Sequence, residues 1–347
     1  MSPKGSSTKG SSTEGNTAGI TIAVTGPTGE IGAAAVEALE REPKVGRILG
    51  MARRPFDPAE RGWRKTEYRQ GDILDESAVR DFVAEAAVVV HLAYLIMGSR
   101  QESRRINLAG TRNVFEATVG ARRPQRLVYT SSVAAYGYHA DNPVPLTEDV
   151  PAKGSPEHYY SEQKAECEQL LTEITAGAGL DVYVLRPCIV AGPHATALAD
   201  NMPWRKVSDR LPDAVVKLLG AAPGLRPIIP DPGIPLQLVH HDDVAAAIAA
   251  AVLGNGRPGA YNLAGDGVVT LTEVAHALGA LAVPVPQALA AAASGVLARL
   301  PLVPAAVEWL HVVRASVVMD TSRAKQGLPW NPQHTSAETL QQMAAVL

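Results

Sequence analysis

The stretch HYYSEQKAE, residues 158–166, places two tyrosines side by side and follows them with one lysine. If this segment is helical, Tyr160 and Lys164 share a face because they are four residues apart, whereas Tyr159 is rotated by about 100°. A nearby ammonium favours the phenolate, which brings the pKa of a tyrosine closer to working pH. We therefore interpret Tyr160 and Lys164 as an acid/base pair, and Tyr159 as packing or a substrate wall. A solvated helix face is the alternative interpretation of the same spacing.

A glycine-rich stretch, TGPTGEIG, ends the first β-branched run and opens the first amphipathic segment. Gly26, Gly29 and Gly32 would allow a tight turn and a close approach of the backbone to a pyrophosphate at the positive end of a helix. This spacing alone is often only a turn. Its position between an expected strand and an expected helix predicts dinucleotide binding.

The residues after the second expected strand, GMARRP, indicate which dinucleotide is bound. An acidic residue there would bind the ribose 2′-hydroxyl of NAD, and an arginine would accommodate the 2′-phosphate of NADP. Arg53 and Arg54 occupy this place, and no acid does. The sequence therefore predicts NADP as the preferred cofactor, with NAD as the alternative. Two arginines exposed to solvent are the simpler explanation of the pair.

A parallel sheet is needed to bring these residues together. From Ile20 onwards, β-branched runs alternate with amphipathic stretches, which predicts an α/β fold with a Rossmann-type doubly wound parallel sheet. We expect a disordered tail at 1–18 and a dinucleotide-binding domain at 19–192. A smaller C-terminal substrate-binding cap is expected at 193–347, with about 235–265 returning to the first domain.

Composition and charge limit the classes of partner. A chain of 347 residues with 46% hydrophobic residues can bury a large core. The formal net charge of -3 gives no electrostatic reason to expect nucleic acid or an anionic membrane, so a small molecule is the expected partner. The apolar segment 284–313 is broken by prolines and Arg299, so it is expected to cover a pocket rather than span a membrane. Cys167 and Cys188 lack metal-type spacing, which suits reduced core residues in the cytoplasm.

With the glycine loop, TSSVAAYG and YSEQK in this order, the chain resembles the extended short-chain dehydrogenase/reductase family, also called the NAD-dependent epimerase/dehydratase family. The resemblance covers residues 20 to about 340. Further matching motifs are GDI, HLA, NLAGT, LRP, VHHDDVA and YNLAG. Members of this family bind a dinucleotide and move a hydride to or from their substrate.

The resemblance assigns roles to the polar residues. Tyr160 would exchange a proton with the substrate oxygen, and Ser132 would hydrogen-bond the same oxygen. Lys164 would lower the pKa of the tyrosine and bind the nicotinamide ribose. Asn107 would complete a proton relay, or else be a buried residue that caps its helix. Ser131 is the alternative to Ser132.

The resemblance also implies a set of cofactor contacts along the carboxyl ends of the strands. The adenine would lie at the GDI motif and the rest of the cofactor along the fourth strand. The expected contacts are Gly26, Thr28, Gly29, Glu30, Ile31, Gly32, Arg53, Arg54, Asp72, Ile73, Leu92, Ala93, Tyr160, Lys164 and Pro187.

Two positions depart from the family members that act on nucleotide sugars. Ile189 stands where those members carry an asparagine, and Leu236 stands where they carry an arginine. The run RPCIVAGP looks more like the reductases and hydroxysteroid-type dehydrogenases of the family. The loop 94–100 and the segment 284–313 are expected to face an apolar or partly polar ligand. The expected substrate contacts are Tyr94, Ser132, Tyr159, Ile189 and His194.

No metal is expected. His240 and His241 precede Asp242 and Asp243 in a pattern that looks like a metal site. The resemblance instead makes Asp243 a structural residue at the start of a helix.

The leading hypothesis is an NAD(P)-dependent oxidoreductase that interconverts an alcohol and a ketone or aldehyde on a non-nucleotide small molecule. Reduction is the expected direction in a cell rich in NADPH. The alternatives are a nucleotide-sugar epimerase or dehydratase with tightly bound NAD, and a sensor that binds NADP without catalysis. The resemblance further implies a homodimer formed through the helices around 107–119 and 158–175.

Overall fold

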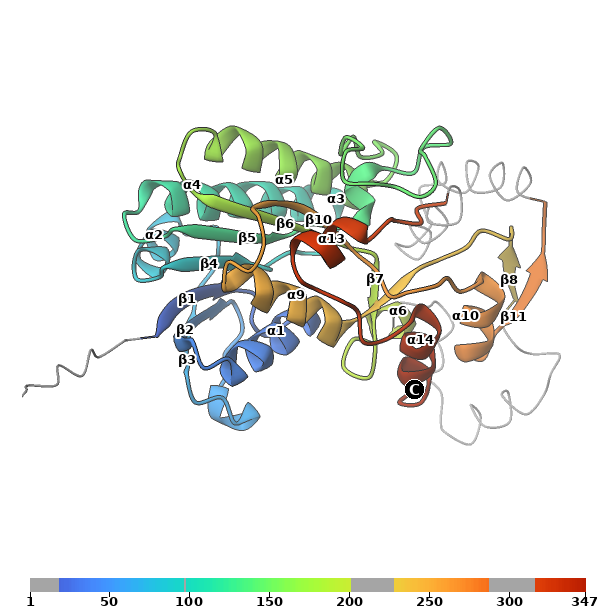
Figure 1. The fold of residues 1–347 in the computed structure, drawn as a ribbon, viewed down its shortest axis with the longest axis horizontal. Helices are drawn as coiled ribbons and strands as arrows, with labels where there is room; N and C mark the ends of the chain where they lie inside the picture. The colour runs from blue at the N-terminus through green and yellow to red at the C-terminus, as the bar shows by residue number, and fades with distance from the viewer. Residues whose placement is uncertain (1–18, 97, 201–227, 287–315) are drawn as a thin grey trace, which may run out of the picture.

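The computed structural model describes residues 19–96, 98–200, 228–286 and 316–347. Its centre is a sheet of seven parallel strands in the order β10-β6-β5-β4-β1-β2-β3 (Figure 1). These strands are β1 (Ile20–Thr25), β2 (Val45–Ala52), β3 (Thr66–Gln70), β4 (Val88–His91), β5 (Arg126–Thr130), β6 (Asp181–Pro187) and β10 (Gly259–Leu263). The prediction of a doubly wound parallel sheet is confirmed. The strand order reverses between β1 and β4, which is where such sheets bind ligands.

Helices cover both faces of this sheet. The helices α1 (Glu30–Arg41) and α9 (His241–Val252) pack together on one face (Figure 1). On the other face lie α2 (Glu76–Ala84), α4 (Thr111–Gly120) and α5 (Tyr159–Thr175). Because both faces are covered, the inner strands are continuous apolar runs: Val88, Val89 and Val90 of β4 are all buried.

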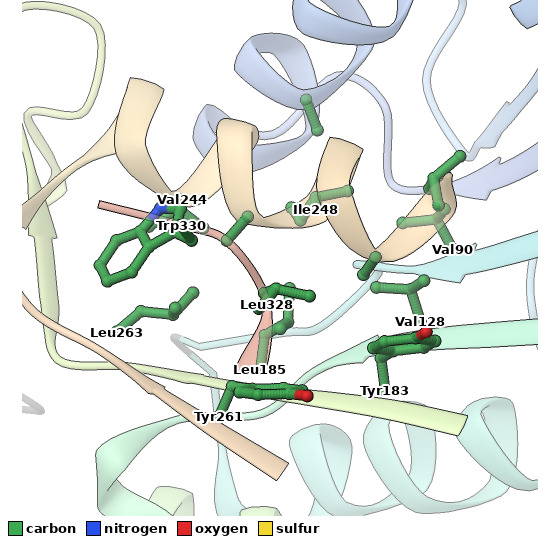
Figure 2. Close-up of a cluster of buried hydrophobic side chains, with 14 of the residues drawn as sticks. Val90, Val128, Tyr183, Leu185, Val244, Ile248, Tyr261, Leu263, Leu328 and Trp330 are labelled. Atoms are coloured by element: carbon green, nitrogen blue, oxygen red, sulfur yellow. The ribbon is translucent and has the colours of Figure 1, made fainter. Parts of the chain in front are cut away.

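The core under α9 is built by residues that are distant in sequence. Figure 2 shows Val244 and Ile248 of α9 above Val128 and Leu185 of the sheet, with Tyr183, Tyr261, Leu263, Leu328 and Trp330 around them. The indole Nε1 of Trp330 donates a hydrogen bond of 2.7 Å to the backbone carbonyl of Asp243. The C-terminal part of the chain is thereby fastened to the sheet.

Short elements beyond the end of β6 form the region where the cap is expected. The strand β7 (Ile189–Ala191) pairs with β9 (Leu238–His240), and β8 (Ile228–Asp231) pairs with β11 (Leu281–Pro284). The helices of this part are α6 (Ala197–Asp200), α10 (Leu271–Ala277) and α14 (Ser336–Ala344) (Figure 1). Between them, α9 and β10 return to the main sheet, and α13 (Ser322–Gly327) packs against β10.

Three short turns complete the described elements. The 3₁₀ turns are η1 (Pro58–Arg61) and η3 (Val133–Tyr136). A π-helical turn, η2 (Arg105–Gly110), joins α3 (Arg100–Arg104) to α4 in one uninterrupted helix. The expected tail at 1–18 and most of the expected pocket cover, 287–313, lie outside the described residues.

Candidate active site

A cavity of about 460 Å³ lies at the carboxyl ends of β1, β4, β5 and β6. Many residues expected from the sequence line it: Gly26, Gly29, Glu30, Ile31, Gly32, Leu92, Tyr94, Ser132, Tyr160, Lys164, Pro187 and Ile189. Ile96, from the loop 94–100 that was expected to face the ligand, also lines it, as does Cys188, which was expected in the core. Further lining residues that the sequence interpretation did not single out are Thr130, Val133, Ala134, Tyr138, Val190, Ala197, Gln237 and Val317. The fold therefore brings the phosphate loop and the Tyr-Lys pair to one space.

The phosphate loop has the shape that its glycines require. Gly26 has a φ of +75°, and a Cβ added there would lie 2.8 Å from the backbone N of Ala93. A Cβ on Gly32 would lie only 1.9 Å from the carbonyl oxygen of Gly26. Gly29 is the N-cap of α1 and has no side chain to satisfy the first N–H groups of that helix. Those N–H groups and the positive end of the helix suit a pyrophosphate.

Arg53 and Arg54 follow directly on β2 and are exposed to solvent. The backbone here is held from the next strand: the Tyr68 hydroxyl donates to the carbonyl of Ala52 at 2.8 Å, and the Gln70 amide donates to the carbonyl of Arg53 at 2.9 Å. These bonds fix the backbone after β2 and leave the guanidinium groups of Arg53 and Arg54 in solvent. No carboxylate occupies this strand end, so the loop lacks the usual partner of an NAD ribose.

Several other expected contacts do not line the cavity. Thr28, Arg53, Arg54, Asp72, Ile73 and Ala93 are outside its lining. Ile73 is buried below Gly110, where an added Cβ would meet its side chain at 2.5 Å. Asp72 accepts the backbone N–H of Leu74 at 3.0 Å and so shapes its own turn.

Ser132, Tyr160 and Lys164 meet where β5 ends against the first turns of α5. The Lys164 ammonium donates to the carbonyl of Thr130 at 3.0 Å. Ser132 accepts the N–H of Ala134 at 3.2 Å, and its hydrogen bond to Tyr160 lowers the pKa of that phenol. The helix begins after His158, whose Nδ1 accepts the N–H of Ser161 at 3.2 Å.

The pKa of Tyr160 does not follow the expectation drawn from the spacing. Burial disfavours the phenolate and raises the pKa of Tyr160 above its ordinary value, more than the Ser132 hydrogen bond lowers it. The ammonium of Lys164 is not directed at the phenol oxygen but lies over the ring of Tyr94, 3.7 Å from its centroid. Burial also lowers the pKa of Lys164, to about 8. Burial therefore outweighs the influences that lower the pKa of the tyrosine, and the role expected of Lys164 stays a prediction.

Tyr159 does not line the cavity in this structure, and its expected role as a substrate wall stays a prediction. Its hydroxyl points to the loop after β4 and donates to the carbonyls of Ile96 and Gly98 at 3.3 and 3.4 Å. The same side of α5 carries Glu162, which forms an ion pair of 2.6 Å with Arg100. Tyr159 thus fixes the loop that bears cavity residues, without lining the cavity itself.

Asn107 also holds this loop. It is buried, as one of its two expected roles required, but it lies inside η2, in the middle of a continuous helix, so it caps no helix end. Its expected part in a proton relay stays a prediction. Its amide oxygen accepts the N–H of Leu95 at 2.8 Å, and its amide nitrogen donates to the carbonyl of Leu95 and to Gln163. With its side chain engaged in this way, Asn107 stays outside the cavity lining.

A buried ion pair supports the end of β5 and was missed by sequence analysis. Arg186 of β6 forms two hydrogen bonds with the carboxylate of Glu168, at 3.0 and 2.6 Å, and both residues are buried. The hydroxyl of Ser131 donates to the same carboxylate at 2.6 Å. Because the Ser131 hydroxyl donates its proton to Glu168 rather than toward Tyr160, Ser132 is favoured as the reactive serine. The i, i+4 spacing of Lys164 and Glu168 could have placed Glu168 on the same helix face as the lysine, but it could not have shown that Arg186 is its partner.

The histidine run at the start of α9 is used structurally. His240, His241 and Asp242 bring three potential metal-ligating groups within 4.8 Å of one another in the described part of the chain. His240, not Asp243, caps the helix: its Nδ1 accepts the N–H of Asp242 at 3.2 Å. The carboxylate of Asp243 accepts two backbone N–H groups of the loop before α14. The expected absence of a metal stays a prediction.

His194 does not line the cavity, although the sequence interpretation made it a substrate contact. Its ring lies 5.6 Å from that of His241, and its backbone N–H donates to Nε2 of His241 at 3.4 Å. His194 therefore belongs to the packing between the turn after β7 and the start of α9.

The part of the cavity away from the phosphate loop is apolar. Ile96, Val133, Cys188, Ile189, Val190, Leu236 and Val317 contribute apolar side chains, and Tyr138 and His158 contribute rings. The charged residues among the described lining residues are Glu30 and Lys164. An anionic diphosphate would find no arginine among the described residues that line this part.

A profile of the NAD dependent epimerase/dehydratase family matches residues 22–264. The chain belongs to this family. It is an NAD(P)-dependent enzyme by this membership, and the resemblance inferred from its motifs is confirmed. Among its described residues, no helix combines the length and the hydropathy that a membrane crossing needs.

Three similar proteins indicate the range of relatives. Uncharacterized protein y4nG of Sinorhizobium fredii is 26% identical over 328 residues, covering 92% of this chain and 76% of that protein. Human 3 beta-hydroxysteroid dehydrogenase type 7 is 33% identical over 199 residues, about half of each chain (51% and 52%). The crystal structure of UDP-glucose 4-epimerase from Thermotoga maritima with UDP-glucose is 19% identical, with a TM-score of 0.69 over 94% of this chain and 98% of that one. The last similarity shows the fold alone.

We expect Gly32→Ala to abolish cofactor binding and to destabilise the protein, because the new methyl group would overlap the backbone of Gly26. Gly120→Ala is the control, since nothing lies within 4 Å of a Cβ there. Fluorescence titration with NADPH and urea unfolding measure the two effects. Full NADPH affinity in Gly32→Ala would contradict the assignment of this loop.

We expect Glu168→Gln to lower the free energy of unfolding by roughly 3–5 kcal/mol, because it leaves the buried Arg186 without a counter-charge. Glu166→Gln, on the same helix, removes a partly exposed ion pair with Arg104 and should cost less than about 1 kcal/mol. Urea unfolding of both variants measures the difference. Equal losses of unfolding free energy in the two variants would show that the Glu168–Arg186 pair stabilises the fold no more than an exposed ion pair does.

Proposed function

We propose that the protein is an NADP-preferring oxidoreductase that reduces a ketone or an aldehyde on an apolar, non-nucleotide small molecule. The observation that carries this proposal is the placement of Ser132, Tyr160 and Lys164 between the phosphate loop and an apolar cavity end. NADPH, when bound along the loop, would supply the hydride. The protein would supply the proton and the orientation of the substrate.

The three polar residues have complementary tasks in this reaction. Ser132 holds the carbonyl oxygen by a hydrogen bond, and Tyr160 gives its phenolic proton to that oxygen as the hydride reaches the carbonyl carbon. The product is the alcohol. Lys164, which lines the cavity, would bind the nicotinamide ribose. The raised pKa of Tyr160 favours this direction, because reduction needs a protonated tyrosine at neutral pH.

One similarity to another protein and one feature of the cavity lining support an apolar substrate. The similarity to a human hydroxysteroid dehydrogenase suits an alcohol–ketone interconversion on an apolar molecule. The side chains of Ile189 and Leu236 line the cavity where nucleotide-sugar enzymes of the family carry polar contacts. A nucleotide-sugar epimerase with bound NAD remains the alternative within the family. A sensor has no need for an acid beside a serine and a lysine.

The expected homodimer through 107–119 and 158–175 stays a prediction. The helices α4 and α5 that contain most of these residues lie side by side on one face of the sheet (Figure 1).

We expect the protein to bind NADPH more tightly than NADH, and Arg53→Ala to remove most of this preference, because a 2′-phosphate needs a cation at the end of β2. The control is Arg61→Ala, which changes an exposed arginine in η1. Fluorescence titration with each cofactor measures the ratio of affinities. Tight NADH binding that Arg53→Ala does not change would favour the epimerase alternative.

We expect Tyr160→Phe to lower kcat for ketone reduction by about 10²–10⁴, since the proton donor is lost. Tyr183→Phe is the control: its hydroxyl donates to the carbonyl of Gly256, outside the cavity lining, so the variant should retain most of kcat. In the wild type, kcat/KM should fall as pH rises through about 8, where Lys164 loses its charge before Tyr160 ionises. Steady-state kinetics on a panel of apolar ketones tests the two variants and the pH dependence of the wild type.

Two outcomes would contradict this function. Unchanged turnover in Tyr160→Phe would remove the tyrosine from the mechanism. Micromolar affinity for UDP in a calorimetric titration would show that the cavity accepts a nucleotide.

A further inference from the structure

The ammonium of Lys164 lies among aromatic rings rather than in water. Its Nζ is 3.7 Å from the ring centroid of Tyr94, 5.3 Å from that of Tyr129 and 5.9 Å from that of Tyr160. The residue is only 3% exposed, and the hydrogen bond seen for its side chain goes to the carbonyl of Thr130. At such distances the negative face of an aromatic ring attracts a cation.

Tyr94 differs from the other two rings in its distance and its position. It follows β4 by three residues, lines the cavity, and stands edge-on to Tyr160, with ring centroids 5.6 Å apart at 85°. A lysine ammonium has three donors. One of these donors bonds the Thr130 carbonyl, and the ring face of Tyr94 lies against the ammonium in a second direction. Because Lys164 also lines the cavity, the remaining direction is open to a cofactor.

We propose that Tyr94 is a positioning residue whose ring face holds the Lys164 ammonium at the cavity wall and stabilises its positive charge. The consequence for turnover rests on the proposed function, but the charge state of Lys164 can be measured without a substrate. The loop that carries Tyr94 is fixed by Asn107 and Tyr159. The backbone next to Tyr94 is therefore held by two side chains.

The surroundings of Lys164 leave little other stabilisation for its charge. Burial disfavours the ammonium, and the acidic groups that oppose this effect are Cys167 and Glu168 of the same helix. Glu168 already forms the ion pair with Arg186. The other titratable groups around the lysine are His91 and Tyr94 from β4 and the loop after it, Tyr129 from β5, and Tyr160 from α5.

The hydroxyl of Tyr94 provides a control. It is buried and makes no hydrogen bond of standard geometry among the described residues, although the side chain of Asn107 lies close enough to act on it. Removing it in Tyr94→Phe keeps the ring face and loses no more than this contact. Tyr94→Leu removes the ring. Tyr94→pentafluorophenylalanine, introduced by codon suppression, keeps the ring shape but reverses the charge distribution on its face.

The experiment follows the titration of Lys164 by NMR in protein labelled with ¹³C at the lysine ε-carbon, with the signal assigned by its loss in Lys164→Met. We expect Tyr94→Phe to match the wild type within about 0.3 pH units, and the leucine and pentafluorophenyl variants to titrate roughly one pH unit lower. The pH at which NADPH affinity declines should move by the same amount. Circular dichroism and thermal unfolding verify that each variant is folded.

The proposal is overturned if all three variants titrate with the wild type. It is also overturned if the leucine variant shifts while the pentafluorophenyl variant does not, because the cause would then be packing or water entry. If the shifts occur but no ketone is reduced, the role of Tyr94 stands and the proposed reaction fails.

Discussion

The junction between the end of β5 and one face of α5 supports the rest of the site. Tyr160, Lys164 and Glu168 follow each other at four-residue intervals, so a single helix face presents all three to the strand end. Lys164 bonds the Thr130 carbonyl, and Glu168 bonds the Ser131 hydroxyl. This contact sets the position of Ser132 relative to the phenol. A shift of α5 along its axis would separate the acid from the serine.

The adjacent face of the same helix fixes a different part of the cavity. Tyr159 bonds the carbonyls of the loop after β4, Gln163 bonds Asn107, and Glu166 forms an ion pair with Arg104. One helix therefore positions both the reactive groups and the loop opposite them. The two adjacent tyrosines have separate structural tasks: Tyr160 faces the cavity and Tyr159 faces the loop.

The sequence predicted the local features well and the long-range ones poorly. Gly26 and Gly32, the Tyr160–Lys164 spacing and the alternation of strands and helices are short-range signals with a direct physical meaning, and the sheet and the phosphate loop are as expected. The sequence did not reveal that Glu168 pairs with Arg186, since that contact depends on how α5 lies on β6.

Other differences between the expectations and the structure have the same origin. The raised pKa of Tyr160 reflects burial, which spacing along a helix cannot report. Asn107 and His194 were expected at the site because of their place beside motifs. Their side chains or rings instead contact neighbouring segments of the chain, which only the folded arrangement specifies.

The network around Arg186 extends beyond the ion pair. Its guanidinium also donates to the Tyr136 hydroxyl at 2.8 Å, and Tyr136 in turn donates to Asn262 of β10. The end of the cavity that carries Tyr160 is thus supported by a hydrogen-bond network that spans several strands. At the other end, Ile189, Val190 and Val317 contribute apolar contacts. The two ends of the cavity therefore tolerate substitution unequally. Exchanging apolar side chains such as Ile189 and Val190 can change which ligand is preferred, while the hydrogen-bonded end that carries Ser132 and Tyr160 stays unchanged.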